Sequence, residues 1–187
     1  MIIEGIVSTL DESGSAHISP MGPEFGVDLG RFVLKPFKGS QTLANLQRNG
    51  VGVFHILDDA LILAQSVLGL GDRIAVEASQ NVKGWVLRGA CFAWEFEIEQ
   101  FDLSQNRSRV FCRVVKERSI RPFGGWNRAQ FAVMELAILY SRVGILKKEE
   151  ILASMPPLEI LVQKTAGPRE WEAWNLLSVA LRERLEK

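Results

Sequence analysis

The sequence predicts a mainly β domain, either a barrel or a sandwich, followed by a helical subdomain. Up to about residue 120 the chain consists of short runs rich in β-branched and aromatic residues, separated by Gly, Pro and Asp. From Asn127 onward the pattern changes to long helical segments. With 187 residues, of which 47% are apolar, the chain can bury a substantial core.

Six runs in the first part have the composition of strands. They are residues 2–10, 16–19, 27–34, 51–56, 84–99 and 110–117. The stretch 11–14 between the first two runs supplies Asp and Gly where a tight turn needs them. We therefore expect the first two strands to pair antiparallel.

Two helices are expected between these strands. The first covers residues 41–49 and has Gly50 as its stop signal. The second covers residues 60–68 and follows Asp58 and Asp59, either of which could cap it. We expect both helices to lie on the barrel as connections.

The C-terminal part begins with a helix over residues 128–143. Pro156 and Pro157 predict an interruption, and Pro168 suits the first turn of a last helix that reaches about residue 186. No linker rich in Gly and Ser separates the two parts. The sequence thus predicts a barrel over residues 1–120 and a helical subdomain over residues 121–187 packed on it.

Composition argues against several classes of partner and site. The 22 basic and 22 acidic residues cancel and the pI is near 6.8, so no basic excess favours nucleic acid. Cys91 and Cys112 lack the spacing of a metal site or a redox pair, and we expect buried thiols in a reducing cytoplasm. No segment approaches the roughly 18 apolar residues of a membrane span, and a cytoplasmic location is expected.

The segment most suggestive of chemistry lies between the third predicted strand and the helix over residues 41–49. Lys35 and Lys38 precede Gly39, and the hydroxyl residues Ser40 and Thr42 open the helix. The first N–H groups of a helix have no partners within it and attract anions, so a phosphate could bind there. The other interpretation is that Ser40 caps the helix and both lysines are solvated.

Other nucleotide and catalytic signatures are weaker. The segment lacks the Gly-Lys-Ser/Thr ending of a P-loop, and the stretch 69–71 is a dinucleotide-like Gly-Leu-Gly without a third glycine or a βαβ context. There is no Gly-x-Ser-x-Gly elbow. His17 and His55 fall in predicted strands without an evident Ser or Cys partner, although His55 could face a pocket.

Taken together, several motifs resemble the domain-of-unknown-function 447 family of the flavin-reductase-like superfamily. They are, in chain order, Ile18-Ser19-Pro20-Met21-Gly22, Lys35-Pro36-Phe37, Gly39-Ser40-Gln41-Thr42, Asn45-Leu46, Asp58-Asp59 and Asn127-Arg128-Ala129. The resemblance implies a six-stranded split β-barrel of the type that binds flavin mononucleotide (FMN). It also implies a homodimer with the flavin near the subunit interface.

The resemblance assigns two stretches to the cofactor. Ser19, Pro20, Met21 and Gly22 would run beside the isoalloxazine ring. The phosphate and ribityl chain would be held by Lys35, Pro36, Phe37, Lys38, Ser40, Gln41, Thr42 and Asn45. The sequence departs from the family pattern at His55, where relatives tend to have Asn, and at Pro23 and Glu24 in the loop after the ring stretch.

The function implied is that of an FMN-dependent oxidoreductase of unknown substrate. A nicotinamide or deazaflavin donor would supply electrons, and the protein would need no acid or base of its own because the cofactor carries the chemistry. No catalytic residue is assigned. The alternative is a non-catalytic protein that binds flavin or another phosphorylated ligand. Arg128 belongs either to a solvent face or to a charged seam between subunits.

Overall fold

A computed structural model describes residues 1–27 and 29–186. Its contacts divide the chain into two compact units. The first contains residues 1–57 and 71–123, and the second contains residues 58–70 together with the chain from residue 124 onward. Among the described residues, no helix has the length and hydropathy that a membrane span requires.

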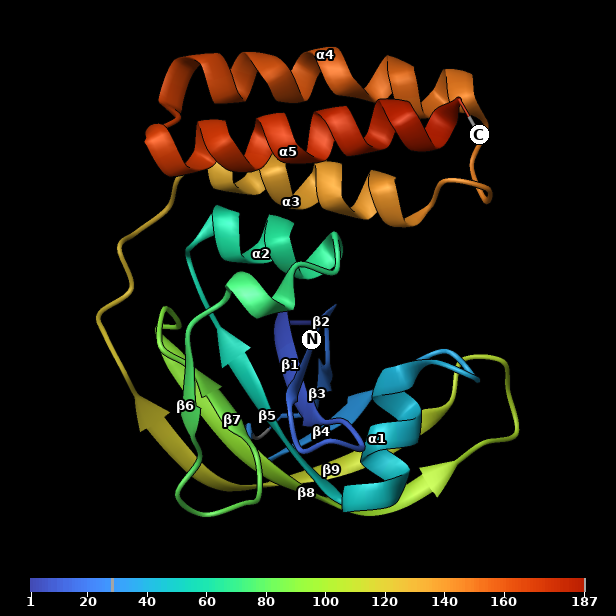
Figure 1. The fold of residues 1–187 in the computed structure, drawn as a ribbon, viewed down its shortest axis with the longest axis vertical. Helices are drawn as coiled ribbons and strands as arrows, with labels where there is room; N and C mark the ends of the chain where they lie inside the picture. Colours follow the sequence, from blue (N-terminus) through green and yellow to red (C-terminus); the bar gives the residue numbers. More distant parts are fainter. Residues whose placement is uncertain (28, 187) are drawn as a thin grey trace. The chain divides into compact units, whose positions relative to one another are not determined.

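The first unit is a curled antiparallel sheet of seven strands in the order β2-β1-β5-β8-β9-β4-β3 (Figure 1). The strands are β1 (Gly5–Leu10), β2 (Ala16–Met21), β3 (Glu24–Phe25), β4 (Arg31–Leu34), β5 (Val51–Ile56), β8 (Phe92–Asp102) and β9 (Arg109–Ser119). As predicted, β1 and β2 pair antiparallel, with Leu10 opposite Ala16. The barrel class is confirmed, although six strands were predicted.

The N-terminal segment brings the two ends of this sheet together. Directly before β1, the N–H of Ile3 donates to the Pro23 carbonyl at 3.2 Å, and the N–H of Phe25 donates to the Met1 carbonyl at 2.7 Å. Ile2 and Glu24 form a bridge between these two bonds. Because β1 lies beside β2 at one end of the order and β3 lies at the other, these contacts close the sheet into a barrel.

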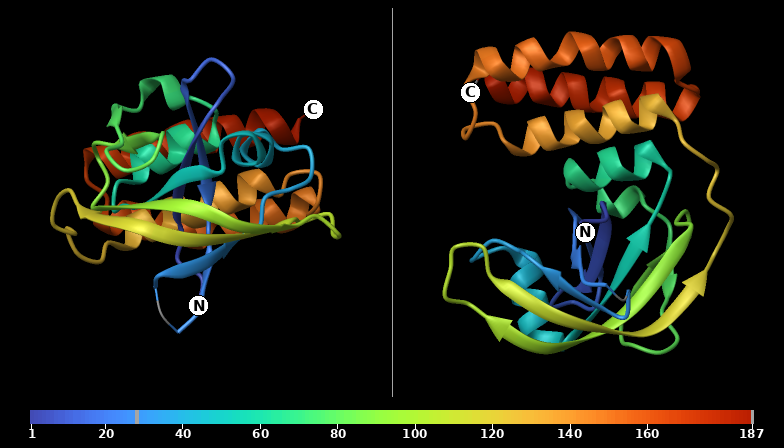
Figure 2. Two further views of the ribbon diagram at one scale, coloured as in Figure 1. Left: turned by 90° about the horizontal axis from the view of Figure 1, so that it is seen from below. Right: turned by 180° about the vertical axis from the view of Figure 1, so that it is seen from behind.

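The expected strand over residues 84–99 is divided in two. A small sheet pairs β6 (Val76–Ala78) with β7 (Trp85–Leu87), and β8 begins a separate strand after a turn. Strands β8 and β9 form a long curved hairpin (Figure 2). Its register shifts between Glu95 and Phe96 and again between Ile98 and Gln100. Such irregularities bend a strand, which suits closure of the barrel.

Aromatic rings fill the barrel. Their centroids lie 5.1–6.1 Å apart in tilted and edge-on pairs, the geometry that aromatic side chains prefer. The cluster contains Phe25, Phe32, Phe54, Trp94 and Phe96. Helix α1 (Gln41–Asn49) packs Leu43 and Leu46 into the same core. Its bounds match the predicted helix, and Gly50 ends it in the left-handed conformation at φ 69°.

The second unit is a bundle of four helices. They are α2 (Ala60–Val67), α3 (Arg128–Ser141), α4 (Lys148–Thr165) and α5 (Pro168–Leu185). Their apolar faces share one core that includes Leu61, Leu136 and Leu177. Residues 60–68 were expected to lie on the barrel as a connection, and the contacts group α2 with the helical unit. Helix α2 is apolar on nearly all sides, and it buries Ala60, Leu61 and Ala64 among the other three helices of this unit.

The predicted interruption at Pro156 and Pro157 was wrong, because α4 continues through both residues. Both proline rings lie on the exposed side of the helix, whereas Ile151, Met155 and Val162 form its buried stripe. A proline removes one helical N–H and displaces a carbonyl, but water can satisfy the freed carbonyl on an exposed face. Burial of the continuous apolar stripe therefore outweighs the free energy lost with the helical hydrogen bonds at the two prolines.

His55 on β5 is a structural residue of the barrel. Its side chain is completely buried. The N–H of Leu87 donates to Nε2 at 3.1 Å, so Nε2 is an acceptor and the ring proton lies on Nδ1, which faces the Ile6 carbonyl at 3.2 Å. Both nitrogens are thus satisfied in the neutral form. Burial lowers the pKa of His55 to about 4.

This pKa makes stability depend on pH. Between pH 6.5 and about 4 the unfolded chain binds a proton at His55 that the folded chain does not. The free energy of unfolding should therefore fall by about 3 kcal/mol as pH falls through this window, at about 1.4 kcal/mol per pH unit. Urea unfolding of the unmodified protein and of His55→Gln measures this. His55→Gln should be less stable at pH 7, and its free energy of unfolding should lack this dependence on pH. Parallel slopes of the free energy of unfolding against pH for the two proteins would contradict the prediction.

Candidate functional site

The chain between β4 and α1 is held against the loop that joins β8 to β9. The N–H of Ser108 donates to the Pro36 carbonyl at 3.0 Å, and the N–H of Lys38 donates to the Asn106 carbonyl at 3.0 Å. Pro36 is buried, whereas Lys38 is exposed. The predicted anion segment therefore has a fixed backbone with a lysine on its open side.

Charged and aromatic side chains surround this segment. Arg107 stacks its guanidinium 4.4 Å from the ring centroid of Phe37, which is itself 49% exposed. Lys35 forms an ion pair with Glu24 and lowers the pKa of that carboxyl group. Because Glu24 already compensates Lys35, the exposed Lys38 is the better placed of the two lysines to meet an anion. Arg107 was not predicted, since only the fold brings its loop to Phe37.

Ser40 is the N-cap of α1. Its Oγ accepts a hydrogen bond from the N–H of Leu43 at 3.3 Å, so Ser40 does cap the helix, whereas Lys35 is paired with Glu24 rather than merely solvated. The cap uses a lone pair of Oγ and leaves the hydroxyl proton available as a donor. Within the described part of the chain, nothing accepts from the N–H groups of Gln41 and Thr42. The helix end therefore keeps three donors for a ligand.

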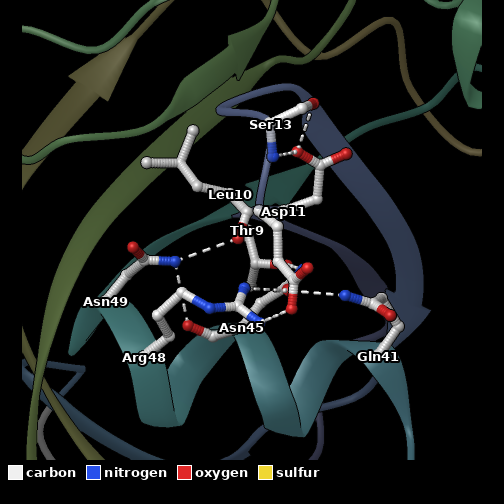
Figure 3. A network of polar contacts seen from close by, with 9 residues as sticks. Thr9, Leu10, Asp11, Ser13, Gln41, Asn45, Arg48 and Asn49 are labelled. Atoms are coloured by element: carbon white, nitrogen blue, oxygen red, sulfur yellow. Dashed lines mark hydrogen bonds and ion pairs between the residues drawn. The ribbon is translucent and has the colours of Figure 1, made fainter.

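A network of polar contacts fixes α1 to β1 (Figure 3). Asn45 is fully buried, and its Nδ2 donates to Thr9 Oγ1 at 3.0 Å. Its Oδ1 accepts from Gln41 Nε2 at 2.7 Å and from Arg48 at 3.2 Å. Asn49 adds a bond to the backbone of the same strand at 2.9 Å. The predicted site residue Asn45 thus uses its amide to hold the helix in place.

His17 on β2 joins the two stretches that the sequence assigned to one ligand. Its Nε2 lies 3.1 Å from Oγ1 of Thr42, in the first turn of α1. Side chains two residues apart on a strand share a face, so His17, Ser19 and Met21 lie on the same side of β2. Thr42 is only 3% exposed, so this contact lies in a nearly buried position. Sequence reasoning noticed His17 but had no signal for this partner.

The rest of the predicted ring stretch lies along the edge strand β2. Ser19 and Pro20 are half-buried and pair with Val7 and Ile6 of β1. Met21 packs against the aromatic core of the barrel. Gly22 lies close to the N-terminal segment, and a Cβ atom on it would approach side-chain atoms of Ile2 and Glu4 at 2.8 Å.

Family models match both parts of the sequence. The N-terminal domain of a protein family of unknown function, DUF447, matches residues 3–121, and the model of the C-terminal part of that family matches residues 127–178. This chain belongs to the DUF447 family. The resemblance noted in the sequence is therefore confirmed. No curated protein matches this DUF447 chain.

Solved structures share the split-barrel fold of this DUF447 protein. An FMN-bound DUF447 protein from Methanosarcina mazei is 22% identical, with a TM-score of 0.81 over 96% of this chain and 94% of that one. An FMN-binding protein from Thermus thermophilus is 13% identical, with a TM-score of 0.54 over 63% and 70%. The styrene monooxygenase flavin reductase of Pseudomonas putida S12 is 18% identical, with a TM-score of 0.51 over 64% and 82%. These likenesses establish the fold.

Two of the DUF447-like motifs have structural roles within the helical unit. Asp59 accepts from the N–H of Leu61 at 3.0 Å as the N-cap of α2, and it forms an ion pair with Arg169 at 2.6 Å. Asn127 caps α3 by accepting from the N–H of Ala129 at 2.7 Å. These side chains fix where two helices begin. In this chain Asp59 and Asn127 therefore serve as helix caps.

The Asn45 network yields a prediction about stability. Asn45→Leu would leave the buried Thr9 hydroxyl without its partner, and the free energy of unfolding should fall by about 1–3 kcal/mol. Gln47→Leu is the matched control because Gln47 is exposed on the same helix, where a substitution should change stability by about 0.5 kcal/mol or less. Chemical unfolding measures both. Equal effects of the two variants would show that the buried amide does not fix α1.

Proposed function

We propose that this DUF447 protein binds FMN on its barrel, with the flavin phosphate at the N-terminal turn of α1. The observation that carries the proposal is the contact between His17 and Thr42. It brings the ring stretch on β2 beside the first turn of α1, as one elongated ligand would require. The proposal is supported by the FMN-bound family member from Methanosarcina mazei, whose fold covers nearly the whole chain.

The residues at the helix end fit a phosphate group. The N–H groups of Gln41 and Thr42 and the hydroxyl proton of Ser40 are the available donors, and the partial positive charge of the helix end attracts an anion. Lys38 is exposed next to them and supplies a full positive charge. Hydrogen bonds to a charged acceptor are stronger than neutral ones, so these few groups can select a phosphorylated ligand.

Strand β2 suits the polar edge of a flavin ring. It is the first strand in the sheet order, and its residues Ser19 and Pro20 pair with β1 on one side. An edge strand presents unpaired backbone N–H and C=O groups on its other side. The stretch from Ser19 to Gly22 can therefore offer donors and acceptors to the ring edge. Lys35, Pro36 and Phe37 would lie beside the ribityl chain of the flavin, which leads to the phosphate.

We propose further that the protein is an oxidoreductase and a homodimer with the flavin near the subunit interface. Bound FMN would supply the redox chemistry, with a nicotinamide or a deazaflavin as the electron donor. The protein then has to bind and orient the flavin, and its residues need not act as an acid or base. This division of work agrees with a site composed of backbone amides, hydroxyl groups and one exposed lysine.

A single chromatographic experiment tests the function. The purified protein, saturated with FMN, should elute with flavin absorbance between about 350 and 500 nm and with about twice the chain mass of 20.9 kDa by light scattering. Reduced nicotinamide or a reduced deazaflavin should bleach that absorbance. Bound flavin that neither donor reduces would support a non-catalytic flavin-binding protein instead. Protein that elutes without flavin would reject the proposal.

Ser40 allows a test of the phosphate position that leaves the helix cap intact. Asp and Asn cap helices about as well as Ser, so Ser40→Asp and Ser40→Asn should both fold with nearly unchanged melting temperature. Only the aspartate places a negative charge where the phosphate would bind. Like charges about 4 Å apart near a surface repel by more than about 1 kcal/mol. The affinity for FMN should therefore be at least about tenfold lower in Ser40→Asp than in Ser40→Asn.

Riboflavin, which lacks the phosphate, is the ligand control for this pair. Its affinity should be the same for Ser40→Asp and Ser40→Asn, as measured by fluorescence titration. If the aspartate weakened both ligands equally, or weakened neither, the phosphate would not lie at the cap of α1.

A further inference from the structure

The two nitrogens of His17 have different surroundings. Nε2 contacts Oγ1 of Thr42 at 3.1 Å, whereas Nδ1 has no hydrogen-bond partner among the described residues. The buried side-chain polar atoms without a partner, within the same residues, are Oγ of Ser108 and Oγ of Ser178. Since Nδ1 is not among them, it reaches solvent. The ring is therefore held on one side and open on the other.

The surroundings of His17 favour its neutral ring over the protonated one. Burial lowers the pKa of His17, and the negative charge of Asp11 opposes this effect in part. Asp11 lies in the turn after β1, and its carboxylate is engaged by the N–H groups of Ser13 at 2.8 Å and Ser15 at 2.9 Å. A neutral imidazole has one donor nitrogen and one acceptor nitrogen. The role of Nε2 therefore decides what Nδ1 can do.

The Thr42 hydroxyl supports either tautomer, because it can donate to Nε2 or accept from it. When the hydroxyl donates to Nε2, the ring proton lies on Nδ1, and the open side of the ring becomes a hydrogen-bond donor. The opposite arrangement would present a lone pair to the open side. An anion next to the ring favours the first arrangement, because only a donor can bind it. Thr42, which is only 3% exposed as a residue, then acts through His17.

We propose that His17 is a specificity-determining residue, whose Nδ1–H donates to the phosphate group of the flavin and so distinguishes phosphorylated from unphosphorylated flavins. This inference rests on the proposed function. It assigns Thr42 as the positioning residue that holds Nε2 in place, while the phosphate selects the tautomer. It also explains why the first turn of α1 lies against the face of β2 that carries His17, Ser19 and Met21.

Two substitutions separate this role from a structural one. The amide of Gln reaches the position of Nε2, whereas the amide of Asn reaches that of Nδ1. His17→Gln keeps the link to Thr42 and loses the donor at the open side, so its preference for FMN over riboflavin should fall about tenfold or more. His17→Asn keeps a donor at the open side, so the preference should remain within about threefold of that of the unmodified protein.

The titrations give a decision in every case. The proposal is supported if His17→Gln loses the preference for FMN over riboflavin and His17→Asn keeps it. Any other pattern across the two variants overturns it. If the unmodified protein bound FMN no more tightly than riboflavin, the proposed function itself would fail.

A measurement on the unmodified protein does not depend on the folding of variants. The chain has two histidines, and the buried His55 serves as an internal reference in a nitrogen-15 NMR spectrum. Addition of FMN should shift the His17 ring signals toward the tautomer with the proton on Nδ1, and riboflavin should not. Identical spectra with both ligands would overturn the proposal.

Discussion

The position of helix α1 on the barrel is the constraint on which the candidate site depends. Leu43 and Leu46 enter an aromatic core that closes only because the N-terminal segment pairs with β3. The apolar contacts fix which face of the helix points inward, and the buried amide of Asn45 fixes its position along β1. Once the helix is held in this way, its first turn must lie next to β2. The packing of the helix alone then orients the N–H donors at its N-terminus.

The two histidines show how environment decides the role of one residue type. His55 lies on a central strand, where backbone groups on both sides satisfy the ring and burial keeps it neutral. His17 lies on the edge strand, where one nitrogen is held and the other reaches solvent. A ring with both nitrogens satisfied contributes to stability alone. A ring with one open nitrogen can also bind a ligand, and the difference arises from the strand order rather than from local sequence.

The division of labour within the chain follows from this arrangement. In the barrel unit, the backbone at Pro36 and Lys38 is fixed and Ser40 caps the helix, and we propose that the donors left at this helix end bind an anion. In the helical unit, the side chains of Asp59 and Asn127 cap two helices. The apolar stripe of α4 continues past two prolines. A flavin would bring its own redox chemistry, so a site that binds and orients without an acid or base is sufficient for an oxidoreductase.

Local sequence determined the elements whose signals are local. The bounds of α1, the turn between β1 and β2 and the Ser40 cap follow from turn residues, glycine and hydroxyl groups, which act within a few residues. Tertiary structure decided the rest. The unit to which α2 belongs, the continuity of α4, the closure of the barrel and the pairing of His17 with Thr42 all depend on contacts between distant segments. Such contacts are set by which apolar faces can be buried together, and this free energy is not encoded at any single position.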